Sequence, residues 1–238
     1  IINTSGNTEY NKSKYKQVFH DAFNKWDEVI TSAPGGWNLS VTIDFQVMED
    51  DILGGDDPYS GSKGAAELVI NSYIKSFFSE GKNIRIAIAR AGNVIGGGDW
   101  STNRIIPDCV KSWYKNKNVK IRNPNSTRPW QHVLDAIRGY IILAIRLDNS
   151  KIHGEAFNFG PDSKQNQKVL DLVKEIKKNW QGIKYKVKKN RRFIDNESKL
   201  LKLNSNKAKK LLNWYPVLNF EKSVNFTMNW YKKYRSQG

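Results

Sequence analysis

Two short runs of the sequence combine residue types that suit the binding of a phosphorylated ligand. The first, residues 90–100, follows an apolar stretch, passes through a glycine-rich turn and contains one amide side chain, Asn93. Glycines allow backbone N–H groups to approach a bulky ligand closely. The second, residues 122–133, holds two arginines, two prolines, a tryptophan and a histidine. Because guanidinium groups bind diphosphate oxygens through paired hydrogen bonds, the two runs together predict a site for a phosphorylated, ring-bearing ligand.

Each of these residues also has an ordinary structural explanation. A glycine triplet is usually a loop, and a lone Asn93 caps a turn more often than it binds a substrate. Arg122 and Arg128, taken singly, are typical surface charges. The clustering of both arginines with Trp130 and His132 favours the ligand site.

A third feature is a tyrosine followed four residues later by a lysine. Tyr59 and Lys63 would lie on one face of a helix, about one turn apart. The lysine ammonium favours the phenolate, so the tyrosine could take a proton from a hydroxyl group. The same spacing recurs elsewhere in this lysine-rich chain, and an exposed helix pair is the alternative. The small residues between positions 61 and 66 leave room for a close approach, but the residues alone do not decide between the two alternatives.

These segments, with the run Asp-Pro-Tyr-Ser-Gly-Ser-Lys-Gly-Ala-Ala-Glu at residues 57–67, resemble the sugar-nucleotide branch of the extended short-chain dehydrogenase/reductases. Within that branch they are most similar to the CDP-glucose 4,6-dehydratase family. The similarity extends from Glu49 nearly to the C-terminus, including residues 200–208 and 229–231, and is weak between residues 163 and 196. It implies a lyase of deoxysugar and polysaccharide biosynthesis that converts CDP-glucose to CDP-4-keto-6-deoxyglucose by hydride transfer to and from NAD.

The resemblance also assigns roles to individual residues. The implied catalytic residues are Tyr59, Lys63 and Ser5. The implied NAD contacts come from Tyr59, Lys63, Ala91 and Val94. The implied contacts to the nucleotide-sugar substrate come from Asn93, Arg122, Arg128, Trp130 and His132, with Arg128 on the diphosphate. Asp135 is expected to anchor the helix that follows it rather than to act chemically.

Two departures from the family pattern bear on activity. The chain has no Gly-x-Gly-x-x-Gly motif, so the half-domain that binds the NAD phosphates is expected to precede Ile1. The family's Thr-Ser-Asp-Lys is replaced by Thr-Ser-Gly-Asn at residues 4–7, which removes the acid and the lysine that assist water elimination. We therefore expect a C-terminal fragment or a degenerate member, inactive as given and weak in NAD binding. The alternatives are an epimerase or reductase of the same superfamily, or a non-catalytic binding or scaffold protein.

The elements that would position these residues alternate between strand and helix. Apolar spacing predicts strands at residues 84–89 and 157–160. It predicts helices at residues 58–79, 105–114, 133–147, 169–180, 207–212 and 221–234. This alternation indicates an α/β fold with parallel pairing. We expect a partial Rossmann-type parallel sheet, without its N-terminal half, and a smaller C-terminal substrate-binding domain.

One segment does not fit this pattern. Apolar residues follow one helical face over residues 15–30, a Pro-Gly-Gly break follows, and residues 37–47 alternate strictly between apolar and polar. We therefore expect residues 13–47 to be an inserted helix–turn–strand unit. Residues 1–12 and 48–95 would be the remnant of the NAD-binding Rossmann domain, and residues 96–238 mainly the sugar-nucleotide-binding domain.

Composition limits the class of protein further. No apolar run reaches the ~20 residues of a membrane span, and the chain contains a single cysteine, which fits a reducing cytoplasm. No metal site is expected. The net charge of +16 raises nucleic-acid binding, but no nucleic-acid-binding motif accompanies the basic run at residues 184–192, an expected exposed strand. Attraction of an anionic sugar nucleotide is the simpler explanation, and a homo-oligomer is compatible with the sequence.

Overall fold

The structure is a computed structural model that describes residues 58–78, 85–147, 149–162, 165–180, 183–187 and 203–237. The chain separates into the units Ile1–Ser40 and Val41–Gly238, and every described residue belongs to the second. The predictions for Ser5, for residues 1–12 and for the insert at residues 13–47 fall outside the described residues. The division between residues 48–95 and 96–238 stays a prediction.

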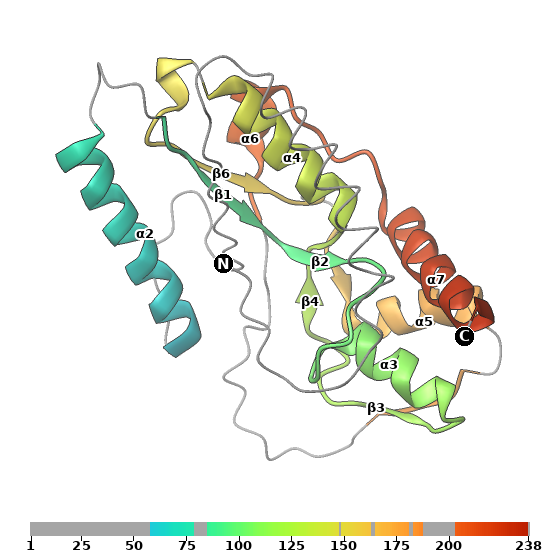
Figure 1. Cartoon of the computed structure of the whole chain (residues 1–238). Coiled ribbons are helices and arrows are strands. Elements are labelled where there is room, and N and C mark those ends of the chain that lie inside the picture. Colours follow the sequence, from blue (N-terminus) through green and yellow to red (C-terminus); the bar gives the residue numbers. More distant parts are fainter. Residues whose placement is uncertain are drawn as a thin grey trace. The chain divides into compact units, whose positions relative to one another are not determined.

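Within the described part of the chain, helices alternate with single strands or groups of strands, except that the last two helices follow one another (Figure 1). In order they are α2 (Pro58–Phe77), β1 (Ile88–Ala91), β2 (Asn93–Ile95), α3 (Ile105–Tyr114), β3 (Val119–Ile121), β4 (Thr127–Arg128), β5 (Trp130–His132), α4 (Val133–Arg146), the 3₁₀ turn Ser150–Ile152, β6 (Ala156–Phe159), β7 (Gln167–Lys168), α5 (Val169–Asn179), β8 (Tyr185–Val187), α6 (Asn206–Leu212) and α7 (Phe220–Gln237). None of these helices has the length and hydropathy that a membrane crossing requires.

The strands pair mainly in parallel, which confirms the α/β prediction. β1 pairs with β6, β2 with β5 and β3 with β8, all in parallel, whereas β4 and β7 are antiparallel. All four residues of β1 are buried, as expected for a parallel strand covered on both faces. Figure 1 shows β2 continuing the course of β1, so the chain passes from one parallel pair directly into the next.

The helices predicted from apolar spacing are confirmed to within a few residues, and α3 has the predicted bounds. Of the strand predicted at residues 84–89, Ile84 lies outside the described residues, residues 85–87 are not in a strand, and the strand begins at Ile88. The reason lies in the hydrogen bonds of Ile86. Its N–H donates to Nδ1 of His153 at 3.1 Å, and its carbonyl accepts from Gly154 N–H at 2.8 Å, so it is bonded to a turn before the ladder begins.

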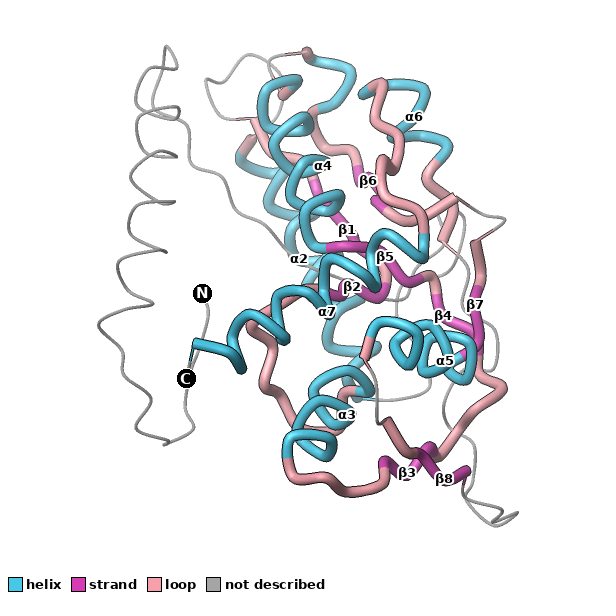
Figure 2. The backbone as a smooth tube through the Cα atoms, turned by 90° about the vertical axis from the view of Figure 1, so that its right-hand side faces the viewer, coloured by secondary structure: helices cyan, strands magenta, loops and turns pink. Residues whose placement is uncertain are grey.

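A buried apolar cluster includes residues of α3, β3, α5 and α7. Figure 2 shows α5 and α7 next to each other, and their residues are in contact. Cys109 of α3 is fully buried in this cluster. Burial raises the pKa of its thiol far above the ordinary value, with a smaller contribution in the same direction from Asp108.

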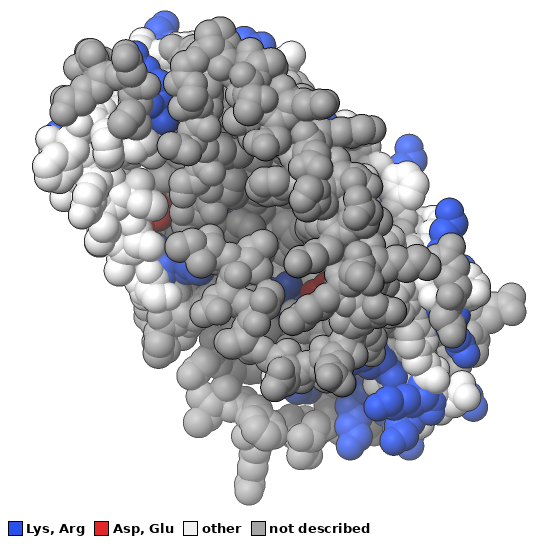
Figure 3. All heavy atoms as spheres, viewed as in Figure 1, with Lys and Arg blue, Asp and Glu red and all other residues white. Residues whose placement is uncertain are grey.

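Basic side chains gather where α3 and β3 lie, as Figure 3 shows. Lys120 of β3 and Lys186 of β8 are register partners, and both are exposed. Within the predicted basic strand the structure describes β8, in which Tyr185 is half-buried and Val187 is 41% exposed. The side of this strand that carries Tyr185 and Val187 is therefore only partly covered.

Candidate functional site

The pairing of β2 with β5 brings the two predicted ligand runs together. Asn93 is the register partner of Trp130, and Ile95 is the register partner of His132. Gly92, which joins β1 to β2, allows this approach. A Cβ at that position would lie 3.0 Å from the carbonyl oxygen of Pro129 and 3.2 Å from its Cγ. Close packing against the second run thus favours a glycine at position 92 of the first.

The paired positions contain buried polar atoms that have no hydrogen-bond partner among the described residues. They are Oδ1 of Asn93, an acceptor, and Nε1 of Trp130, a donor. Buried polar groups in native proteins are nearly always paired with protein, water or ligand. An unpaired acceptor and an unpaired donor at adjacent strand positions therefore indicate a place where a polar ligand can bind.

The two predicted arginines differ in their surroundings. Arg128 of β4 is only 8% exposed, and its guanidinium donates to the carbonyl oxygen of Thr127 at 2.8 Å. It precedes Trp130 by two residues. Arg122 is exposed in the loop after β3, and among the described residues it has no hydrogen bond or ion pair to β2 or β5. The structure therefore brings Arg128, but not Arg122, to the paired strands.

His132 has a structural partner as well as a place in the predicted site. Its Nδ1 accepts a hydrogen bond from Leu134 N–H at 3.3 Å and so caps the N-terminus of α4. Burial lowers the pKa of the imidazole below its ordinary value, and Asp135 opposes this shift only in part. The ring is therefore neutral at pH 7, with its proton on Nε2, which leaves one N–H donor for a ligand.

Helix α2 carries the predicted catalytic pair of Tyr59 and Lys63. An ion pair that the sequence did not reveal joins this helix to the first ligand run. Lys63 is half-buried, and the side chain of Tyr59 lies outside the described residues. One turn beyond Lys63, Glu67 is fully buried and accepts two hydrogen bonds from Arg90, at 2.7 and 2.5 Å. The sequence offered two signals for this ion pair. One is the glutamate four residues after Lys63, and the other is the arginine that opens the first run.

Gln131 joins the two parallel pairs. Its side chain is 1% exposed, and its Nε2 donates to the carbonyl oxygen of Phe159, the last residue of β6, at 2.6 Å. Gly92 N–H also donates to that oxygen, at 3.3 Å. The end of β6 is thus bonded both to the start of the first ligand run and to the second.

Asp135 has a structural role, as expected, but its carboxylate bonds to a segment other than the helix that it was predicted to anchor. Its carboxylate accepts hydrogen bonds from the backbone N–H groups of Val217 and Leu218, at 3.0 and 2.9 Å. Asp135 lies in the first turn of α4 and is 2% exposed. It therefore fixes the segment that leads into α7, and not only its own helix.

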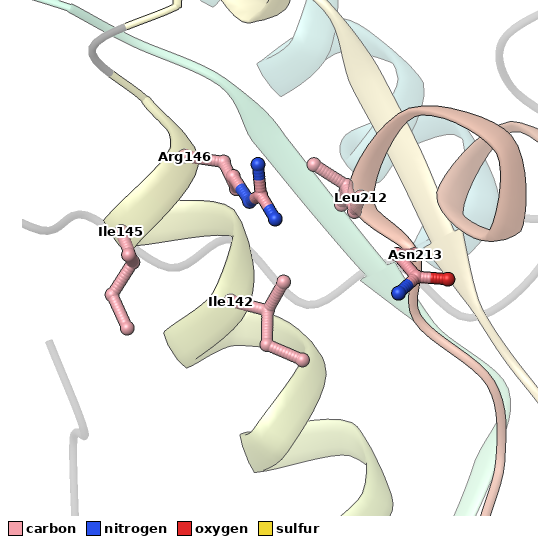
Figure 4. A pocket seen from close by; sticks show the side chains of 5 residues that line it. All are labelled: Ile142, Ile145, Arg146, Leu212 and Asn213. Carbon is pink, nitrogen blue, oxygen red and sulfur yellow. The ribbon is translucent and has the colours of Figure 1, made fainter.

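The described part of the chain also contains a pocket whose lining residues belong to neither ligand run. Figure 4 shows it between α4 and α6, lined by Ile142, Ile145, Arg146, Leu212 and Asn213. Its volume is about 280 Å³, and its lining is mostly apolar. Since it contains none of the predicted ligand residues, it is not the predicted site.

Several known proteins are similar to this chain in sequence. The sequence profile of the GDP-mannose 4,6 dehydratase family matches residues 41–227. The CDP-glucose 4,6-dehydratase of Salmonella typhimurium is 40% identical over 190 residues, which are 77% of this chain and 52% of that protein. The dTDP-D-glucose 4,6-dehydratase of Dictyostelium discoideum is 30% identical over 136 residues, 57% of this chain and 29% of that protein. The chain thus spans about half, or less, of the length of these relatives.

Solved structures show the same fold. The dTDP-glucose 4,6-dehydratase of Bacillus anthracis in complex with NAD matches with a TM-score of 0.62 and 22% identity, over 84% of this chain and 59% of that one. The epimerase Mth375 of Methanothermobacter thermautotrophicus matches with a TM-score of 0.64 and 23% identity, over 95% of this chain and 68% of that one. These likenesses extend the α/β assignment to part of a Rossmann-type epimerase/dehydratase fold. The match of the family's sequence profile to most of the chain shows that the chain belongs to the GDP-mannose 4,6-dehydratase family.

Proposed function

We propose that this chain forms the nucleotide-sugar-binding part of a 4,6-dehydratase and that its substrate is CDP-glucose. The observation that carries the proposal is the parallel pairing of β2 with β5, because it makes Asn93 and Trp130 register partners, and each has a buried polar atom without a hydrogen-bond partner among the described residues. Arg128, which is itself buried, precedes Trp130 by two residues on β4. The 40% identity to a CDP-glucose 4,6-dehydratase supports CDP over other nucleotides.

The proposed roles follow from the donors and acceptors that each side chain offers. Arg128 binds the diphosphate, since a guanidinium matches phosphate oxygens with paired donors. Asn93 accepts a hydrogen bond from a sugar hydroxyl through its unpaired Oδ1. The indole N–H of Trp130 and the Nε2–H of His132 donate to further oxygens. Arg122, exposed on the neighbouring loop, makes at most a peripheral contact to the nucleotide.

The proposed reaction chemistry rests on α2. Tyr59 removes the proton of a sugar hydroxyl, and the ammonium of Lys63, four residues later on the same helix, favours the phenolate that does so. Ser5 is the third proposed member of this set. NAD, when bound, supplies the hydride acceptor. Lys63 and the backbone at Ala91 and Val94 would hold its nicotinamide side.

Calorimetric titration of the 238-residue chain with CDP-glucose tests the proposal. Arg128→Ala should weaken binding by roughly 10- to 150-fold, the loss of a charged hydrogen bond worth about 1.5–3 kcal/mol. Asn93→Ala should weaken it by a smaller factor. Arg146→Ala is the matched control, because it removes the same charge from an exposed position on α4. Equal affinity of the Arg128→Ala and Arg146→Ala variants would remove Arg128 from the site. Tighter binding of dTDP-glucose than of CDP-glucose would overturn the choice of nucleotide.

A further inference from the structure

The glycine turn of the first ligand run lies directly against an indole ring from the C-terminal helix. A Cβ at Gly97 would lie 2.1 Å from Cγ and 2.2 Å from Cδ2 of Trp230, closer than any side chain can approach. At Gly98, whose φ is +80°, a Cβ would meet the far edge of the same ring at 3.6 Å. Both glycines are exposed on their remaining side. Trp230 therefore forms one wall of the turn and leaves the other side open to a ligand.

Neighbouring aromatic residues fix the position of this indole. The ring of Trp230 stacks on that of Tyr234, with centroids 5.3 Å apart and an interplanar angle of 11°. Tyr231 meets it edge-on at 5.2 Å. The hydroxyl of Tyr231 donates to the carbonyl oxygen of Asp99 at 2.7 Å, so α7 is bonded to the residue that follows the glycines. The turn thus has two consecutive contacts with one helix.

The same helix also contacts the second ligand run. Phe226 lies one turn before Trp230, and its ring meets the imidazole of His132 edge-on at a centroid distance of 5.9 Å. Residues of α7 contact both β2 and β5, and Figure 2 shows α7 running past these strands. One rigid element therefore contacts both runs of the proposed site, at positions one helical turn apart.

We propose that α7 sets the geometry of the nucleotide-sugar site and that Trp230 is a positioning residue for the turn formed by Gly96, Gly97 and Gly98. This proposal rests on the proposed function, because it concerns the affinity of that same site. Glycines adopt many backbone conformations, so a turn without a wall would have to be ordered by the ligand at the expense of affinity. Trp230 orders the turn in advance and directs its backbone groups to the open side.

The first test measures CDP-glucose affinity by calorimetry in three variants of the 238-residue chain. Trp230→Ala should weaken binding by at least about tenfold, and Trp230→Phe, which keeps an aromatic wall, should stay within about threefold of the unmodified chain. Tyr215→Ala is the control, because it removes an aromatic ring that is 54% exposed and lies outside both runs. Circular dichroism of each variant confirms the fold before titration.

The second test is a double-mutant cycle between Gly97 and Trp230. Gly97→Ala should weaken CDP-glucose binding in the unmodified chain, because its methyl group collides with the indole. In the Trp230→Ala background the same change should have a much smaller effect, since the colliding ring is gone. If Gly97→Ala prevents folding only when Trp230 is present, the contact itself is supported, and the comparison of Trp230→Ala with Trp230→Phe still measures its effect on binding.

The outcomes separate this proposal from the function on which it rests. A folded, unmodified chain that does not bind CDP-glucose overturns the proposed function, and with it this proposal. A chain that binds CDP-glucose with the same affinity after Trp230→Ala overturns the positioning role alone. Additive effects of Gly97→Ala and Trp230→Ala on affinity would likewise show that the ring does not act through the turn.

Discussion

Glu67 and Arg90 form a buried ion pair that joins the helix of the proposed base to the strand that leads into the ligand site. Nε of Arg90 donates to one carboxylate oxygen at 2.7 Å, and a terminal nitrogen donates to the other at 2.5 Å. The two side chains are 1% and 7% exposed. Because both bonds must form together, the pair fixes the axial position of α2 as well as its distance from β1.

Removing one member of this pair should destabilise the protein strongly. Arg90→Met would leave the Glu67 carboxylate buried without its partner, at a cost of about 3–5 kcal/mol in the free energy of unfolding. The double change Glu67→Met with Arg90→Met should recover much of this loss, because two apolar chains of similar length can fill the space. Urea denaturation measures both.

The matched control for this experiment is the exposed pair of Arg104 with Asp99, which lie 3.4 Å apart. Arg104→Met should change the free energy of unfolding by at most about 1 kcal/mol. If Arg90→Met were no more destabilising than Arg104→Met, the buried pair would not hold α2 in place.

His132 should make stability depend on pH in the weakly acidic range. Burial lowers the pKa of the folded ring below 6.5, so the unfolded chain takes up a proton before the folded chain does. The stabilisation from the neutral ring is therefore complete above about pH 6.5 and is lost as the pH falls below it, by at most about 1.4 kcal/mol per pH unit. His132→Asn keeps an acceptor for Leu134 N–H but does not titrate. Unfolding free energies between about pH 7 and pH 5 should fall less in this variant; parallel curves would contradict the assignment.

Two glycine-to-alanine changes should have opposite effects on stability. At Gly139 in α4, a Cβ would lie 2.3 Å from Cδ1 of Phe159, so Gly139→Ala should destabilise by about 1–3 kcal/mol through overpacking. At Gly61 in α2 nothing lies within 4 Å, and Gly61→Ala should stabilise by about 0.5–1 kcal/mol through helix propensity alone. Thermal unfolding of both variants shows whether each change raises or lowers the stability. A gain at Gly139 would mean that Phe159 can move aside.

Asp135 should contribute to stability without taking part in ligand chemistry. Asp135→Ala would leave the N–H groups of Val217 and Leu218 unpaired, at roughly 1–3 kcal/mol for each group that stays buried. Asp135→Asn keeps one oxygen acceptor and should show a smaller loss. Chemical denaturation measures the effect. If Asp135→Asn abolished CDP-glucose binding while remaining folded, a role at the ligand would be indicated instead.

The sequence predicted the long elements well because their apolar spacing extends over several turns. The bounds of α3 were predicted in full, and those of α4 and α5 differ from prediction by one residue. β2 and β5 were not predicted. Each has three residues, too few to show a period, and they form because they pair with each other. The site was therefore predicted as two separate runs, and the pairing that unites them came from the structure.

Contacts between distant parts of the chain were also beyond sequence reasoning. Tyr231 and Asp99 are separated by 132 residues, and nothing local in either segment indicates their hydrogen bond. The same holds for Trp230 over the glycine turn. Arg122 and Arg128 looked alike in the sequence, and only tertiary burial distinguished the exposed residue from the one beside β5.

Cys109 can serve as a natural probe of transient opening of the apolar cluster in which it is buried. It is the single cysteine of the chain, and its thiol is fully buried among α3, β3, α5 and α7, with a raised pKa that suppresses the reactive thiolate. A thiol reagent added to the folded protein therefore labels it only during excursions that separate these elements. The rate of labelling at Cys109 therefore measures how often the contacts among α3, β3, α5 and α7 open, and no probe has to be introduced.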